Sequence, residues 1–114
     1  MNGKLELSPF LIRSTESQVT FRFDPASLEN GYEYPATLET LLRQLVGEHA
    51  EMFGDREVLI DLENLPAISS KQLGAMLAVR KTCAPNQKVR VMNLRPNVSE
   101  LLRVTKMEDF FDWS

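Results

Sequence analysis

Several residue types that carry common protein chemistry are scarce in this sequence of 114 residues. Cys83 is the only cysteine, so no internal disulfide can form, and a lone thiol is typical of a reducing compartment. His49 is the only histidine, and no pattern of cysteines or carboxylates completes a metal site around it. The 13 lysines and arginines are outnumbered by 16 aspartates and glutamates, so the net charge of -3 gives no global attraction to nucleic acid. We therefore expect no metal and no nucleic-acid partner.

Long hydrophobic runs and phosphate-binding loops are also missing. No apolar run approaches the roughly 20 residues that span a bilayer, and the first residues lack the apolar core of a signal peptide. These absences predict a cytoplasmic protein without membrane insertion. The sequence contains no glycine-rich phosphate loop, no dinucleotide fingerprint and no serine-histidine-aspartate set with a supporting motif. We expect no cofactor and no enzymatic activity.

What is present is the composition of a globular protein, with 43% hydrophobic and 25% charged residues. A chain of this length forms one hydrophobic core, so we expect a single domain over residues 1–114.

In the first half of the chain, β-branched and aromatic residues predict strands at residues 10–12 and 19–23. Residues 24–33 have the composition of a loop. Leucines at three- and four-residue spacing then predict an amphipathic helix from residue 35 or 36 to residue 52, with Gly54 as its stop.

In the second half, residues 58–62 are nearly continuously apolar, as in a central strand covered on both faces. A helix is expected from residue 69 or 70 to 81 or 82, a strand from residue 89 to an end between 91 and 94, and a short helix from residue 96 or 97. Apolar residues between Met107 and Trp113 predict a closing turn or helix. This order of elements predicts an α/β sandwich with a small mixed sheet of about four strands flanked by helices.

Asp61 stands out because it ends an apolar strand, where an ionised carboxylate is costly unless it is paired or exposed. Ligands of open α/β sheets gather at the carboxyl ends of strands, so Asp61 is a candidate border residue of a site. The alternative is that Asp61 bonds backbone amides of the following loop. Both interpretations stay open at this stage.

Ser69, Ser70 and Lys71 lie at the start of the next predicted helix. A serine there can cap the helix, which typically contributes about 1 kcal/mol. The same helix start offers free N–H groups and a partial positive charge to a phosphoryl group or another anion. Lys71 opposes the helix dipole at this end, which suggests a role other than helix stability, although a solvated surface lysine is the simpler interpretation.

The chain from Glu57 to Phe111 resembles the STAS domain family, whose best known members are bacterial anti-sigma-factor antagonists. The resemblance rests on the strand Val58-Leu-Ile-Asp-Leu62, on Ile68-Ser-Ser-Lys-Gln-Leu-Gly74 in place of the family's switch motif, and on the tail from Val98 to Phe111. The resemblance implies a STAS-like α/β sandwich.

In that family the switch motif reads Asp-Ser-Ser or Thr-Gly-Leu-Gly, and an anti-sigma factor that is also a serine kinase phosphorylates its second hydroxyl residue. The ungapped match places Ser69 on the aspartate, Ser70 on the first serine, Lys71 on the phosphoacceptor, Gln72 on the glycine, and Leu73 and Gly74 on their equivalents. The usual acceptor hydroxyl is therefore replaced by a fixed positive charge.

The resemblance implies a protein-interaction module that regulates transcription or signalling. It would bind an anti-sigma factor or serine kinase through residues 69–73, with Asp61 and Gly74 at the border of the surface. An alternative is a STAS module that senses a nucleotide or another anion, or that serves as a subunit of a transporter. A third and weakest hypothesis, a small enzyme that uses Asp61 and Ser70, lacks a general base near either residue.

If the switch is phosphorylated in this protein, Ser70 is the first candidate acceptor and Ser69 the second. We expect one phosphate on Ser70 after incubation with a partner kinase, measured by mass spectrometry of the intact chain and its peptides. Finding neither serine phosphorylated would contradict phospho-control at this segment.

Overall fold

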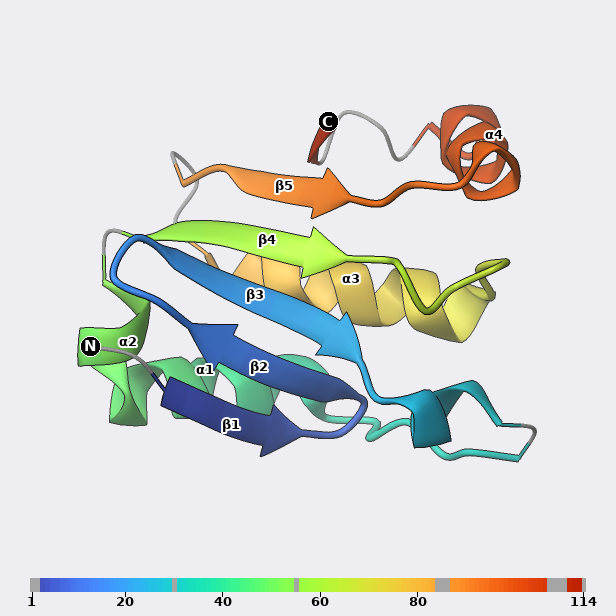
Figure 1. Ribbon diagram of the computed structural model, residues 1–114. Coiled ribbons are helices and arrows are strands. Elements are labelled where there is room, and N and C mark those ends of the chain that lie inside the picture. Colours follow the sequence, from blue (N-terminus) through green and yellow to red (C-terminus); the bar gives the residue numbers. More distant parts are fainter. Residues whose placement is uncertain (1–2, 30, 55, 84–86, 107–110, 114) are drawn as a thin grey trace.

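The computed structural model describes residues 3–29, 31–54, 56–83, 87–106 and 111–113. Its mixed sheet has six strands in the order β1-β2-β3-β4-β5-β6, so consecutive strands are spatial neighbours (Figure 1). The strands are β1 (Gly3–Leu7), β2 (Phe10–Ser14), β3 (Gln18–Phe23), β4 (Glu57–Asp61), β5 (Val89–Met92) and β6 (Asp112–Trp113). β1, β2 and β3 pair antiparallel, whereas β3, β4, β5 and β6 pair in parallel. The predicted α/β fold class is confirmed.

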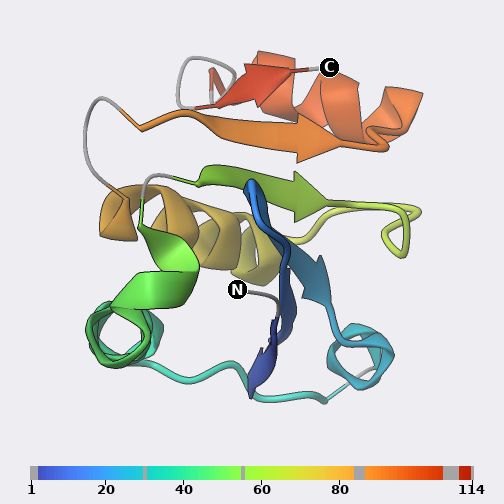
Figure 2. The ribbon, with the colours of Figure 1, turned by 60° about the vertical axis from the view of Figure 1, so that its left-hand side comes forward.

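The helices are the 3₁₀ helix η1 (Pro25–Leu28), α1 (Leu38–Glu48), α2 (Ala50–Phe53), α3 (Ser70–Thr82) and α4 (Pro96–Val104). α1 and α3 lie side by side on one face of the sheet, behind it in Figure 1 and to one side of it in Figure 2. In the described part of the chain, no helix covers the other face of β1 to β4. We call this second face the open face.

Side-chain alternation along the strands explains this arrangement. Phe10 and Ile12 of β2 lie opposite Phe23 and Phe21 of β3, and all four are buried beneath the helices. The Phe10 and Phe21 rings meet edge to face with their centroids 5.4 Å apart, a favourable aromatic geometry. The alternate positions of the same strands point to the open face and are polar apart from Leu11.

Strand β4 is buried on both faces, as its apolar sequence predicted. Val58 and Ile60 point toward the helices, whereas Leu59 belongs to the open face and is nevertheless only 3% exposed. In the register Leu59 lies between Thr20 of β3 and Arg90 of β5.

The expected number of about four strands was wrong, because β1 and β6 were missed. The alternation of Lys4, Leu5, Glu6 and Leu7 is a two-residue period that could have revealed β1. β6 has only two residues, too few for a sequence pattern, and its pairing with β5 depends on tertiary structure. Residues 107–110 of the expected closing turn or helix lie outside the described residues, and β6 follows them.

The single helix expected to run to residue 52 was also wrong in detail. α1 begins at Leu38 and ends at Glu48, His49 leaves the helical conformation with φ -125° and ψ 43°, and α2 then resumes at Ala50. Gly47 precedes this break, and a glycine weakens a helix by about 1 kcal/mol relative to alanine. After the break, Met52 and Phe53 are both buried in the core.

Candidate functional site

The loop between β4 and α3 is held firmly to the sheet by its own apolar residues. Leu62 and Leu65 are buried and belong to the main hydrophobic core. The Leu62 N–H donates to the Met92 carbonyl at 3.0 Å, and the Leu65 N–H donates back to the Leu62 carbonyl at 2.9 Å. The loop therefore has a fixed path from the end of β4 to the start of α3.

Side chains also tie this loop to segments that are distant in the sequence. Three of them donate hydrogen bonds to carbonyl oxygens, namely Asn64 to Phe23 (3.3 Å), Arg95 to Glu63 (3.1 Å) and Asn97 to Pro66. The first bond joins the loop to the end of β3, and the other two join it to the start of α4. Carbonyl groups of the loop and of the end of β3 are thereby satisfied.

Asp61 is the centre of a second set of contacts. Its Oδ1 accepts hydrogen bonds from the Glu63 N–H at 2.9 Å and from the Asn93 Nδ2 at 2.8 Å. Its Oδ2 lies 3.8 Å from the Arg22 Nε, and Arg22 also lies within 3.6 Å of the Glu63 carboxylate. The carboxylate thus bonds the amide of the following loop, which is one of the two roles expected from the sequence.

The register places Asp61 on the open face, opposite Arg22 of β3 and Met92 of β5. Helix α3 covers the other face of the sheet. The Asp61 side chain therefore holds the loop from the open face of the sheet. It does not lie among the side chains at the start of α3.

Helix α3 begins with a capping box. The Ser69 hydroxyl accepts from the Gln72 N–H at 3.2 Å, and the Gln72 Oε1 accepts from the Ser69 N–H at 2.7 Å. This reciprocal pair satisfies two donors at the helix start and fixes the direction in which the chain enters α3. Ser69 is thus a structural cap, as expected from its position.

The remaining predicted residues divide by exposure. Ser69, Ser70, Lys71 and Gly74 are exposed, whereas Gln72 and Leu73 are half-buried, and Leu73 packs against the core. We call the four exposed residues the α3 start surface.

A shallow groove of about 360 Å³ adjoins this surface. One wall is α3, with Lys71, Gly74 and Lys81, and the other is the segment from Tyr34 to Glu39 that leads into α1. Sequence reasoning missed this second wall, because the segment is more than 30 residues away in the chain and carries no motif.

Tyr34 closes one side of the groove. Its hydroxyl donates to the Ser27 carbonyl at 3.3 Å, which connects the groove to the buried Ser27 of η1. Burial raises the pKa of the Tyr34 phenol, and hydrogen bonds with Ser27 and Gln72 partly oppose this effect. Tyr34 is therefore a neutral wall of the groove at physiological pH.

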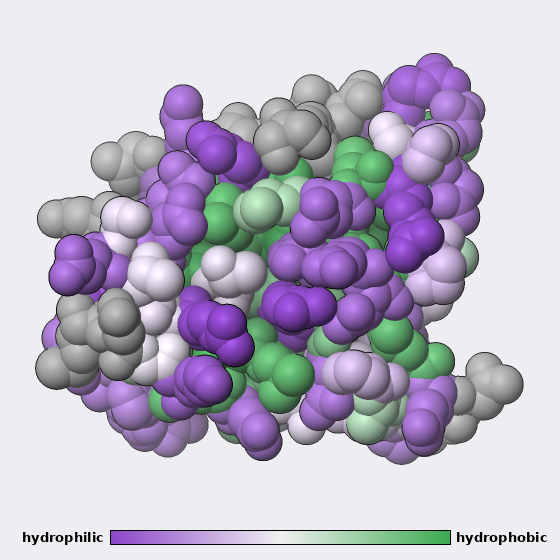
Figure 3. Space-filling model, viewed as in Figure 1, coloured by the Kyte–Doolittle hydropathy of each residue, from purple (hydrophilic) through white to green (hydrophobic). Residues whose placement is uncertain are grey.

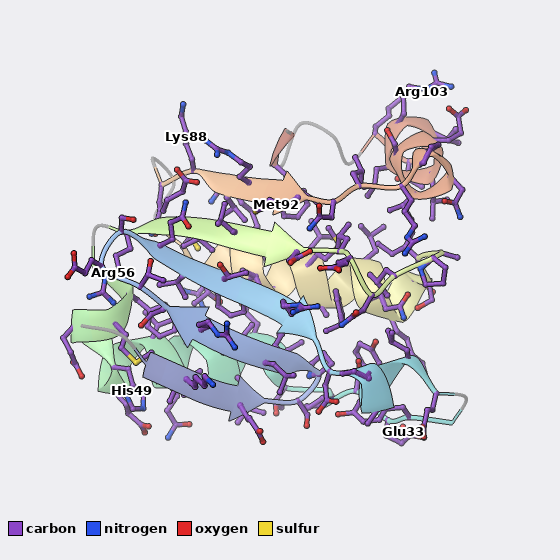
Figure 4. The ribbon with its side chains drawn as sticks, viewed as in Figure 1. Glu33, His49, Arg56, Lys88, Met92 and Arg103 are labelled. Atoms are coloured by element: carbon purple, nitrogen blue, oxygen red, sulfur yellow. The ribbon has the colours of Figure 1, made fainter. Side chains whose placement is uncertain are left out.

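The histidine and the cysteine, whose side chains are more reactive, lie outside the α3 start surface. His49 lies at the end of the molecule opposite to the β4–α3 loop (Figure 4). Burial raises the pKa of the Cys83 thiol, with Arg80 opposing, so the thiolate is scarce at neutral pH. Within the described residues, histidine, cysteine and carboxylate side chains form no cluster of three that could hold a metal ion.

The arrangement around α3 is a preformed, partly basic surface beside a groove, carried by a mixed sheet with helices on one face. Sequence comparison assigns it to a family, since the STAS domain model matches residues 16–114. The chain belongs to the STAS domain family. This match is longer than the stretch from residue 57 that carried the resemblance, and it includes β3 and α1.

A comparison with curated protein sequences found no match. In the part of this STAS chain that the structure describes, the helices are too short or too polar to cross a bilayer.

The capping box gives a first stability prediction. Ser69→Ala removes the acceptor for the Gln72 N–H and should lower the free energy of unfolding by about 1 kcal/mol in urea denaturation. Ser70→Ala is the matched control, because Ser70 is exposed in the first turn and should change stability by less than about 0.5 kcal/mol. Equal losses for the two variants would contradict the assignment of Ser69 as the cap.

The contacts of Asp61 give a second stability prediction. Asp61→Ala removes the acceptor of two hydrogen bonds and should lower the free energy of unfolding by about 1–3 kcal/mol. Asp61→Asn keeps an acceptor oxygen and should lose less. Amide hydrogen exchange at Glu63 should accelerate in the alanine variant, and an unchanged exchange rate would argue against Asp61 as the anchor of the loop.

Proposed function

We propose that this STAS protein is a non-enzymatic regulatory module of one domain that resembles the anti-sigma-factor antagonists. It binds a protein partner through the loop and helix start at residues 69–73, and the position of the usual phosphoacceptor is occupied by Lys71. A regulatory partner such as an anti-sigma factor with kinase activity fits this proposal, as does a cytoplasmic location.

The observation that carries the proposal is the preformed shape of the α3 start surface. Its loop is anchored to β3, β5 and α4, and its helix is capped, so binding needs little further ordering of this segment. Interfaces that are already ordered in the free protein lose less conformational entropy when the partner docks. The segment is therefore suited to recognition by surface complementarity.

Charge supports an acidic partner. Lys71 and Lys81 flank the groove, and neither has an ion pair within the described residues. Glu39, the acidic residue on the opposite wall, lies 3.6 Å from Arg43. The groove is thus locally positive in a protein whose net charge is -3. Complementary charge raises association rates and helps to select the partner.

Gly74 supports close approach of that partner. A Cβ atom built on Gly74 would meet nothing within 4 Å, so the fold itself does not require glycine there. A bare backbone on an exposed helix face lets the main chain of another protein come nearer than a side chain would allow. Gly74 is the position where added bulk should interfere with binding and leave the core intact.

Lys71 also affects whether phosphorylation can control partner binding. A phosphoryl group at this position would add nearly two negative charges and could repel a partner. A serine kinase does not modify lysine, so we propose constitutive binding, with Ser70 first and Ser69 second as the exposed candidates for phosphorylation.

Binding of a nucleotide or another anion at the same helix start is the alternative. Lys71 favours it, but the capping box already engages the N–H groups of Ser69 and Gln72. Fewer donors remain for an anion, so we favour the protein partner. Thermal stabilisation of the protein by ATP or GTP would reverse this preference.

The test is a titration with the regulatory partner, purified after capture from the native host. Lys71→Glu reverses the charge beside the groove and should weaken binding at least tenfold, which corresponds to about 1.4 kcal/mol. Gly74→Leu should weaken binding to a similar degree by adding bulk. Calorimetry on the wild type and both variants gives the dissociation constants.

Lys88→Glu is the matched control, because Lys88 is an exposed lysine beside β5, at a distance from the groove (Figure 4). It should bind like the wild type. Affinity unchanged by both Lys71→Glu and Gly74→Leu would reject the α3 start surface as the binding site.

A further inference from the structure

Strand β1 forms one edge of the sheet. It pairs with β2 along all five of its residues, and no strand pairs with its other side in the described part of the chain (Figure 1). An unpaired edge presents backbone N–H and C=O groups that can bond another strand. The pairing of β1 with β2, and of β2 with β3, determines which residues of β1 carry these unpaired groups.

One contact beside β2 shows which of its residues form backbone hydrogen bonds with β3 and which with β1. The Asp24 N–H donates to the Pro9 carbonyl at 2.8 Å, next to the pair Phe10 and Phe23. Because hydrogen-bonded and non-hydrogen-bonded pairs alternate in antiparallel sheets, residues 9, 11 and 13 direct their backbone groups toward β3. Residues 10, 12 and 14 therefore direct theirs toward β1.

The partners of residues 10, 12 and 14 on β1 are Leu7, Leu5 and Gly3. These residues use their backbone groups to bond β2. The backbone groups of Lys4 and Glu6 consequently point away from β2, toward the free edge. The two residues that offer hydrogen bonds at this edge thus carry side chains of opposite charge.

The side chains of Lys4 and Glu6 lie on the open face, where hydrophilic residues cover much of the surface (Figure 3). Lys4 lies directly opposite Arg13 of β2, and like charges at such a pair are destabilising. Neither cation has an ion pair within the described residues. Glu6 lies on the same face two residues from Lys4, but within the described residues it forms no ion pair with either cation.

We propose that the β1 edge binds a second copy of this chain, with the two β1 strands antiparallel about a twofold axis at Leu5. Lys4 of each copy then lies opposite Glu6 of the other, and these residues exchange backbone hydrogen bonds. The carboxylate of Glu6 enters the row of Lys4 and Arg13 of the other copy and places a negative charge directly opposite Lys4. The two sheets join into one continuous sheet.

Charge selects this register among the neighbouring ones. A twofold axis at Lys4 would place the two Lys4 side chains opposite each other, and an axis at Glu6 would oppose the two Glu6 side chains. Only the axis at Leu5 pairs opposite charges and keeps the outward backbone groups of both strands in register. The edge strand is thus self-complementary.

The first test is the mass in solution, by sedimentation over a wide concentration range. The wild type should approach twice the 13.0 kDa of the single chain as concentration rises. Lys4→Glu and Glu6→Lys each create like-charge pairs at the interface and should raise the dimer dissociation constant by about tenfold or more. The double variant Lys4→Glu with Glu6→Lys restores opposite pairs and should recover the dimer.

The second test reports the register. Leu5 would face its own copy in a non-hydrogen-bonded pair with Cα atoms about 4.5 Å apart, within disulfide range. Leu5→Cys in a Cys83→Ala background should therefore form a covalent dimer on mild oxidation. Leu7→Cys is the matched control, because its two copies would be roughly 14 Å apart and should crosslink far more slowly.

A wild type that stays monomeric at every concentration would overturn the proposal. So would a dimer that both single charge variants leave intact, or crosslinking at residue 7 as fast as at residue 5. None of these outcomes depends on the partner-binding surface at α3, which lies on the helical side of the sheet.

Discussion

Parallel pairing of β4 with both β3 and β5 is the constraint on which the rest of the structure depends. Parallel strands end at the same edge of a sheet, so the segments that follow β3, β4 and β5 emerge together. Asn64 can therefore reach the end of β3, and Asn93 can reach Asp61. The polar contacts that fix the α3 start surface are a consequence of strand direction as much as of the residues themselves.

Elements with a strong local pattern could be predicted from the sequence. β4 has a nearly continuous apolar run, and α3 begins with serines that can cap a helix, so both were located within one or two residues. β1 alternates regularly, but it is only five residues long and contains no β-branched or aromatic residue, so it was missed. The break at His49 was missed because the leucine spacing continues up to it, and the burial of Met52 and Phe53 after the break depends on tertiary packing.

The candidate site could be predicted only in part, for the same physical reason. The residues of the α3 start surface lie within six positions of the chain, so a single motif indicates them together. The second wall of the groove and the donors that hold the loop come from segments about 30 or more residues away, and one sequence contains no signal of such contacts. The environment of Asp61 illustrates the difference, since its sequence position only allowed a bond to the following loop and the structure shows it.

The hydrogen bonds that Arg95 and Asn97 donate to carbonyls of the β4–α3 loop also limit how well a peptide could imitate the α3 start surface. A synthetic peptide of residues 62–74 would contain the serines, the lysine and the glycine, but not the side chains that satisfy its carbonyl groups. In water such a peptide would lose the path of the loop and most of the helix, because short isolated helices are marginal. The recognition surface is therefore a property of the folded chain, and an inhibitor that imitates it would need a scaffold that replaces β3, β5 and the start of α4.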